Sequence, residues 1–140
     1  MSKLEDIEVR VEQTNSPSQV LVILNELQSK LTALAEQGTN DSIDLRSLPL
    51  FPGDYEQLKE RLGYGEIHVS IDAMGLTEIY ETMIPGIWWV THYNSQEEVI
   101  AEYIELTTLP ELLKTDPQDI KQAKRQLQQL IDNYDHTLNS

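Results

Sequence analysis

Four short apolar segments follow one another between residues 66 and 106, and they constrain the fold more than any other feature of the chain. They read EIHVSID, LTEIYETM, IWWVTHY and EVIAEYIEL, and only the links AMG, IPG and NSQE separate them. Links this short suit antiparallel hairpins, whereas parallel neighbours need a crossover of about a dozen residues or more. In IPGI, Pro85 and Gly86 provide the torsions of a type II turn. The pattern therefore predicts an antiparallel meander.

Two helical patterns precede these strands. In residues 16–38 apolar side chains recur at helical spacing, Ser16 and Pro17 suit the start of the helix, and Gly38 suits a left-handed stop. A shorter helix is expected to begin at Pro52 and to end at Gly63. Between the two helices, residues 39–51 form a polar-to-apolar connection that alternates loosely from Ile43 to Leu50, and this connection is expected to lie extended along the domain.

The ends of the chain carry further elements. DIEVRVE, residues 6–12, alternates apolar and charged residues and predicts a strand. After the meander, Thr108 and Glu111 form a capping-box pattern for a short helix, and Asp116 is placed to cap another helix that starts at Pro117. The apolar stripe of that last helix consists of Ile120, Ala123, Leu127, Leu130, Ile131 and Tyr134.

Helices at both ends and strands in the middle predict an α+β fold. We expect an antiparallel four- to five-stranded meander sheet packed with an N-terminal helix, a short middle helix and C-terminal helices. The length of 140 residues suits a single domain, residues 1–140, with a core of its own.

Charge and composition exclude several classes of function. The formal net charge of −14 repels phosphate backbones and anionic lipids, so neither nucleic acid nor a membrane surface is an expected partner. The chain contains no cysteine, which removes disulfides and thiolate chemistry. The first ten residues lack the apolar run of a signal peptide, and a cytoplasmic location is predicted.

Catalytic patterns are weak. His68, Ser70 and Asp72 share one strand face and could hold a metal ion or imitate a catalytic triad, but a solvated polar face explains the same alternation. The glycines of RLGYGEI follow a helix and precede a strand, the reverse of a phosphate-binding loop. The sequence predicts no enzyme, no catalytic residue, no metal ligand and no cofactor.

Alternation along the strands separates neighbouring side chains. Trp88 and Trp89 are expected on opposite faces of the sheet, so a single core has room for only one of them. If helices cover both indoles, both tryptophans are packing residues. If one indole is exposed, it marks a docking surface. Glu78 and Glu81 are expected on opposite faces as well, and so are Glu102 and Glu105. The candidate partner-binding residues are Glu78, Glu81, Trp88, Trp89, His92, Tyr93, Glu102, Tyr103 and Glu105.

The same segments carry a family resemblance. IDLRSLPLFPGDYEQLKERLGYGEI, TEIYETMIPGIWWVTHY, EYIEL and LPELL, in that order, resemble the C-terminal module of the nickel-iron hydrogenase expression/formation proteins of the HupH and HyaF type. The resemblance runs from about Ile43 to Leu113, and family members are longer, with this module in their C-terminal part. No catalytic residue is carried over.

The resemblance implies a cytosolic accessory protein or chaperone in hydrogenase maturation. Its expected partner is the iron-sulfur small subunit precursor or another maturation factor, and a basic client segment, such as a twin-arginine export signal, would complement the acidic residues. Two alternatives stay open. One is a homodimer with the aromatic sheet face as its interface, and the more remote one is a small hydrolase or metal-binding protein.

Overall fold

The computed structural model of the chain describes residues 18–139, and its contacts divide them into two units after Thr108. The sequence pattern predicts one domain for the same stretch. The first unit holds the sheet with two helices, and the second, from Leu109 onward, holds a short turn and a long helix. The strand predicted at residues 6–12 and the start signals at Ser16 and Pro17 lie outside the described residues.

The first unit contains a five-stranded antiparallel sheet with the order β1-β5-β4-β3-β2. The meander from β2 to β5 confirms the hairpin prediction. Ile84 O accepts a hydrogen bond from Ile87 N (3.1 Å), and Gly86 has φ 91°, as a type II turn requires. Part of the stretch expected to lie extended forms the fifth strand, where Ser42 pairs with Glu105. The strands are β1 (Asp41–Asp44), β2 (His68–Asp72), β3 (Leu76–Glu81), β4 (Ile87–Tyr93) and β5 (Val99–Leu106).

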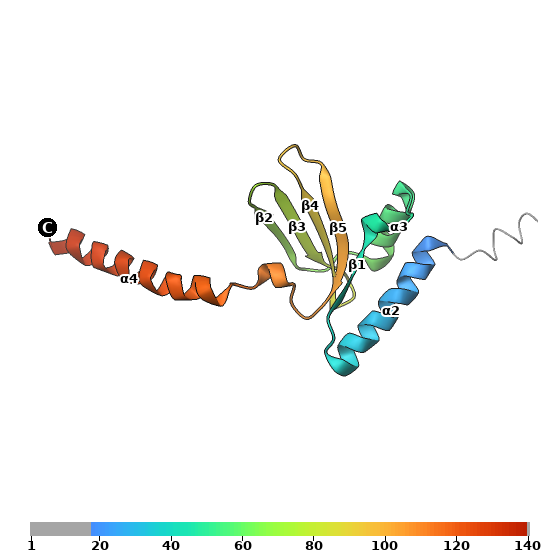
Figure 1. Cartoon of the computed structure of the whole chain (residues 1–140), viewed down its shortest axis with the longest axis horizontal. Helices are drawn as coiled ribbons and strands as arrows, with labels where there is room; N and C mark the ends of the chain where they lie inside the picture. The colour runs from blue at the N-terminus through green and yellow to red at the C-terminus, as the bar shows by residue number, and fades with distance from the viewer. Residues whose placement is uncertain (1–17, 140) are drawn as a thin grey trace, which may run out of the picture. The chain divides into compact units, whose positions relative to one another are not determined.

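Two helices, α2 (Gln19–Gln37) and α3 (Pro52–Leu62), lie on the same face of this sheet (Figure 1). The Ser18 side chain caps α2 by accepting a hydrogen bond from Leu21 N (3.1 Å), so the cap lies two residues after the predicted one. Gly38 ends α2 with φ 70°, and Gly63 ends α3 with φ 71°. The predicted stops of both helices and the predicted start of α3 are confirmed.

The core lies between these helices and the sheet. Trp89 and Ile104 on the sheet are fully buried, as is Leu58 on α3, and Ile23 on α2 is 2% exposed. A short turn, η1 (Leu45–Ser47), leads from β1 toward α3, and its Leu45 is also fully buried. The remaining buried members of the core are Val20, Leu27, Ile43, Leu62, Ile87 and Leu106.

The second unit contains the turn η2 (Glu111–Leu113) and the helix α4 (Pro117–Asn139). Asp116 Oδ1 accepts a hydrogen bond from Gln118 N (2.9 Å), which confirms the predicted cap of α4. The predicted capping box at Thr108 is wrong: η2 follows Pro110 and has no side-chain cap, because proline offers no capping oxygen.

Every side chain from residue 117 to 138 is exposed, the predicted apolar stripe included. None of the helices within residues 18–139 has the length and apolarity needed to cross a membrane.

Candidate functional site

The strand registers divide the predicted site residues between two faces of the sheet. Glu78 pairs with Thr91 and Glu81 with Trp88, so the two carboxylates point to opposite faces, as predicted. Glu102, which also pairs with Thr91, is separated from Glu105 in the same way. The helix-covered face carries Glu78, Trp89, Tyr93 and Glu102, and the other face carries Glu81, Trp88, His92, Tyr103 and Glu105.

Both tryptophans are buried. Trp88 is 3% exposed and Trp89 is fully buried. Each indole N–H has an internal acceptor: Trp88 Nε1 donates to Thr107 O (3.0 Å), and Trp89 Nε1 donates to Glu102 Oε2 (2.8 Å). Because burying the indoles leaves neither donor unpaired, both side chains are packing residues here. Of the two alternatives that the sequence left open, the burial of both indoles supports packing, and neither Trp88 nor Trp89 is an exposed contact residue.

Glu102 is an internal acceptor. Its side chain is 11% exposed, and its carboxylate accepts hydrogen bonds from Trp89 Nε1 and from Thr91 Oγ1 (3.1 Å). Lys59 Nζ lies 3.6 Å from the same oxygen and 5.2 Å from the centroid of the Trp89 ring. The charge of Glu102 is therefore compensated within the chain, and this residue leaves the set of surface candidates.

On the opposite face, His92 links two polar side chains. Its Nδ1 lies 2.7 Å from Thr77 Oγ1, and its Nε2 lies 3.3 Å from Tyr103 Oη. Burial, and then the negative charge of Glu105, raise the pKa of Tyr103. Glu81 Oε2 accepts a hydrogen bond from Gly86 N (3.3 Å) and so supports the β3–β4 turn. These groups are half-buried and occupied with one another, and Glu105 is half-buried as well.

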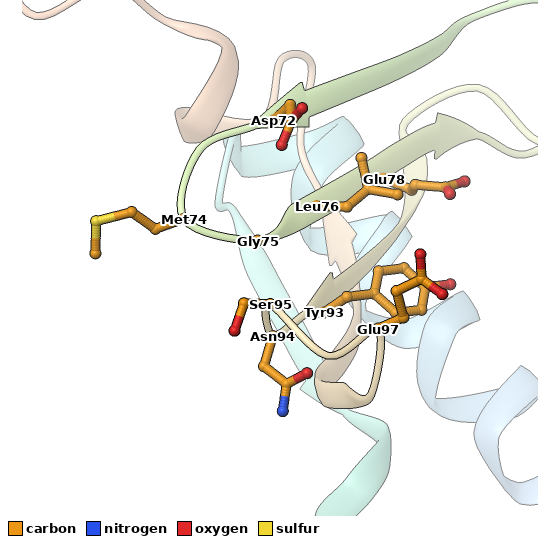
Figure 2. Close-up of a pocket in the computed structure, with 9 residues that line it drawn as sticks. All are labelled: Asp72, Met74, Gly75, Leu76, Glu78, Tyr93, Asn94, Ser95 and Glu97. Carbon is orange, nitrogen blue, oxygen red and sulfur yellow. The ribbon is translucent and has the colours of Figure 1, made fainter.

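At the end of the sheet where the β2–β3 and β4–β5 links meet lies an open pocket of about 740 Å³. Among the described residues its wall includes three carboxylates, Asp72, Glu78 and Glu97, and no lysine, arginine or histidine. Figure 2 shows Tyr93 and the carboxylates of Glu78 and Glu97 on one side of the pocket, with the Met74 side chain extending away from them. The complete lining is Asp72, Met74, Gly75, Leu76, Glu78, Tyr93, Asn94, Ser95 and Glu97.

A smaller pocket of about 360 Å³ adjoins the first through Glu78 and Tyr93, which line both. Here Glu78 Oε2 lies 3.2 Å from His68 Nε2. Burial, followed by the charges of Glu78 and Glu102, raises the pKa of Tyr93. The lining is Lys59, Tyr64, Gly65, His68, Glu78, Tyr80, Thr91 and Tyr93.

We call the two linings together the hairpin-end surface. It unites Glu78 and Tyr93, which the sequence analysis identified, with Glu97 and Asn94, which it missed. The only sequence signal for those two was their place in the NSQE link, and nothing in the sequence shows that this link approaches β2 and β3. Within residues 18–139 no group of three or more histidine, aspartate or glutamate side chains is arranged to hold a metal ion.

The fold and this surface define a small α+β module with an acidic, tyrosine-bearing pocket at one end of its sheet. The chain belongs to the family described as the HupH hydrogenase expression protein, C-terminal conserved region, whose model matches residues 18–134. This match extends beyond the resemblance seen between Ile43 and Leu113 on both sides.

Relatives with known names agree with this membership. The chain is 29% identical over 117 residues to the hydrogenase expression/formation protein HoxQ of Cupriavidus necator, covering 84% of this chain and 40% of that protein. It is 30% identical over 95 residues to HupH of Rhodobacter capsulatus, covering 68% of this chain and 34% of that one. The chain thus spans about two fifths or less of the length of these relatives.

A solved structure shares the fold. The hydrogenase expression protein HupH from Thiobacillus denitrificans superposes with a TM-score of 0.79 and is 38% identical. The alignment covers 81% of this chain and 95% of that one. The α+β architecture predicted from the sequence is therefore the architecture of a solved family member.

Proposed function

We propose that this chain is a non-enzymatic accessory module in the maturation of nickel-iron hydrogenase, acting in the cytoplasm. Its client is the iron-sulfur small subunit precursor or another maturation factor. Family membership supports the maturation role, because the relatives are hydrogenase expression/formation proteins. The hairpin-end surface supports a binding role, because its pockets are open and carry carboxylates and tyrosines.

One observation carries the choice of surface. Asp72, Glu78 and Glu97 line one pocket around Tyr93. Among the described residues the lining of this pocket has no lysine, arginine or histidine, and Glu78 contacts His68 of the adjoining pocket. Carboxylates bind arginine through paired, charge-assisted hydrogen bonds, and a tyrosine ring can stack on a guanidinium group. The surface is therefore complementary to a basic client segment, and the net charge of −14 would accelerate the encounter.

Co-purification with the small subunit precursor tests this surface. We expect Glu78→Lys to lower the recovery of precursor at least about tenfold, because it places a cation inside the acidic pocket. Glu36→Lys is the matched control, since it makes the same change of charge at an exposed position near the end of α2. Equal loss in both variants would show that net charge alone governs binding, and full recovery in both would remove the hairpin-end surface from the proposal.

Complementation tests the maturation role separately. In cells that lack the corresponding gene, the chain should restore hydrogenase activity, and Glu78→Lys should restore less of it than Glu36→Lys. If the wild-type chain restores no activity while it still captures the precursor, the binding proposal stands and the maturation proposal fails.

A further inference from the structure

Helix α4 carries an apolar stripe that its own unit, from Leu109 to Asn139, does not cover. The helix is 23 residues long, and its large apolar side chains are between 46% and 68% exposed. A helix with this much exposed apolar surface on one stripe is typical of a partner-binding helix. The exposed members are Ile120, Leu127, Leu130, Ile131, Tyr134 and Leu138.

The spacing of the stripe is that of a coiled coil. With Ile120 in position a of a heptad, Leu127 and Tyr134 fall in the following a positions. The d positions hold Ala123, Leu130 and, at the end of the helix, the polar Thr137. Ile131 and Leu138 lie beside the seam in the e position. A seam repeating every 3.5 residues suits packing against another helix along its whole length.

The charges of α4 differ between its two halves. In the first half Lys121, Lys124 and Arg125 outweigh Asp119 and make it basic, whereas Asp132 and Asp135 make the second half acidic. Two parallel copies of this helix would place like charges side by side. Two antiparallel copies would place each basic half along an acidic half, which is the favourable arrangement.

The side-chain sizes fit the antiparallel arrangement too. In an antiparallel pair each a position of one helix faces a d position of the other helix. When the two helices cross at their centres, Leu127 of one copy therefore contacts Leu130 of the second copy. In the same register Ala123 meets the partner's Tyr134, so that the smallest seam residue faces the largest. The register is symmetric, and every contact therefore occurs twice, as in a twofold dimer.

We propose that α4 pairs with α4 of a second copy of this chain as an antiparallel coiled coil. The overall charge of −14 opposes association elsewhere on the chain, and the basic half of α4 relieves this repulsion at the contact. The proposal goes beyond the proposed function, since no residue of α4 belongs to the hairpin-end surface. It also places the contact between copies on α4 and not on the aromatic face of the sheet.

Sedimentation equilibrium of the full chain tests the pairing. We expect a concentration-dependent dimer, and we expect Leu130→Asp to lower its association constant about 100-fold or more, because each dimer buries that position twice. Gln129→Asp is the matched control, since it adds the same charge at the neighbouring position, which points away from the seam. A wild-type chain that is monomeric at all concentrations would overturn the proposal, whether the stripe is then covered by the client or by its own chain.

The lack of cysteine in the chain allows the orientation to be tested by disulfide formation. We expect a mixture of Ala123→Cys and Tyr134→Cys chains, distinguished by a mass tag, to form the mixed disulfide. In an antiparallel pair two copies of residue 134 lie about 16 Å apart along the axis, well beyond the reach of a disulfide. Efficient disulfides within each variant alone, with none between the two, would show a parallel pair and refute the antiparallel one.

Discussion

Among single residues, Glu102 has a large expected effect on stability. Its carboxylate accepts hydrogen bonds from the buried Trp89 indole and from Thr91 and lies 3.6 Å from Lys59 Nζ. Glu102→Ala should lower the free energy of unfolding by about 2 to 4 kcal/mol, because it leaves a buried donor and a cation without their acceptor. Glu102→Gln keeps one acceptor oxygen and should lose about half as much. Urea unfolding followed by tryptophan fluorescence measures both.

The exposed Glu60 is the control for this change. Glu60→Ala removes a carboxylate from the surface of α3 and should change the free energy of unfolding by less than about 0.5 kcal/mol. A similar small effect for Glu102→Ala would mean that Trp89 is hydrated and not buried.

Tyr80 presents the opposite case. Its hydroxyl is buried, and no described group accepts or donates a hydrogen bond to it. Tyr80→Phe should therefore raise the free energy of unfolding by about 1 kcal/mol, whereas the matched change Tyr134→Phe, at an exposed ring outside the sheet unit, should have no effect. Thermal unfolding of the two variants distinguishes these outcomes, and a loss of stability in Tyr80→Phe would mean that the hydroxyl has a partner after all.

The same hydroxyl predicts a dependence on alkaline pH. Burial raises the pKa of Tyr80 far above its ordinary value near 10. Above pH ~10 the unfolded chain therefore releases this proton before the folded chain does, and stability falls as the pH rises from that point toward the folded-state pKa. Below pH ~10 Tyr80 adds no slope. Tyr80→Phe should flatten the alkaline loss in urea unfolding measured between pH 9 and pH 11, and an unchanged slope would contradict the burial of this group.

Alternation predicted which face each residue occupies, but it did not predict burial. Glu78 and Glu81 lie on opposite faces because the period of a strand alone decides this. The burial of Trp88 depends on an acceptor at Thr107, 19 residues further along the chain, and that of Glu102 depends on donors from β4 and α3. Partners of this kind arise from tertiary packing, which single-residue patterns do not contain.

At the scale of elements, the β2–β3 hairpin depends on Gly75. Its φ is 137°, and a Cβ at this position would collide with Tyr93 O on the neighbouring hairpin. Gly75→Ala should therefore lower the free energy of unfolding by at least about 2 kcal/mol and distort the hairpin-end surface. Gly53→Ala is the matched control, because nothing lies within 4 Å of its Cβ position. Chemical unfolding measures the difference, and equal stability of the two variants would mean that the two hairpin ends are not in contact.

The elements that the sequence predicted well have local signals. The meander follows from three short links, and α3 follows from Pro52 at its start and Gly63 at its end. The pairing of β1 with β5 joins residues about sixty positions apart and has no local signal. The hairpin-end surface was only partly predicted for the same reason, since two separate links must meet to form it.

At the scale of the whole molecule, two kinds of surface occur in separate units of the chain. The hairpin-end surface is acidic and belongs to the sheet unit, whereas the α4 stripe is apolar and belongs to the second unit. The sheet unit has a continuous core that includes Leu45, Leu58 and Trp89, and no described side chain of α4 is buried. The proposed client binding and the proposed self-association therefore use different residues, and they can be removed one at a time.

A chain that stops at Asp116 tests this separation. Because no side chain between residues 117 and 138 is buried, the truncation should shift the thermal midpoint of the sheet unit by less than about 3 °C, whereas the loss of 1 kcal/mol would shift it by about 4 °C or more. Both tryptophans lie in that unit, so their fluorescence reports its unfolding directly. The truncated chain should be monomeric and should still capture the small subunit precursor through Glu78. A large drop in the midpoint would show that the sheet unit needs α4 to fold, and loss of capture with an unchanged midpoint would show that the client binds α4.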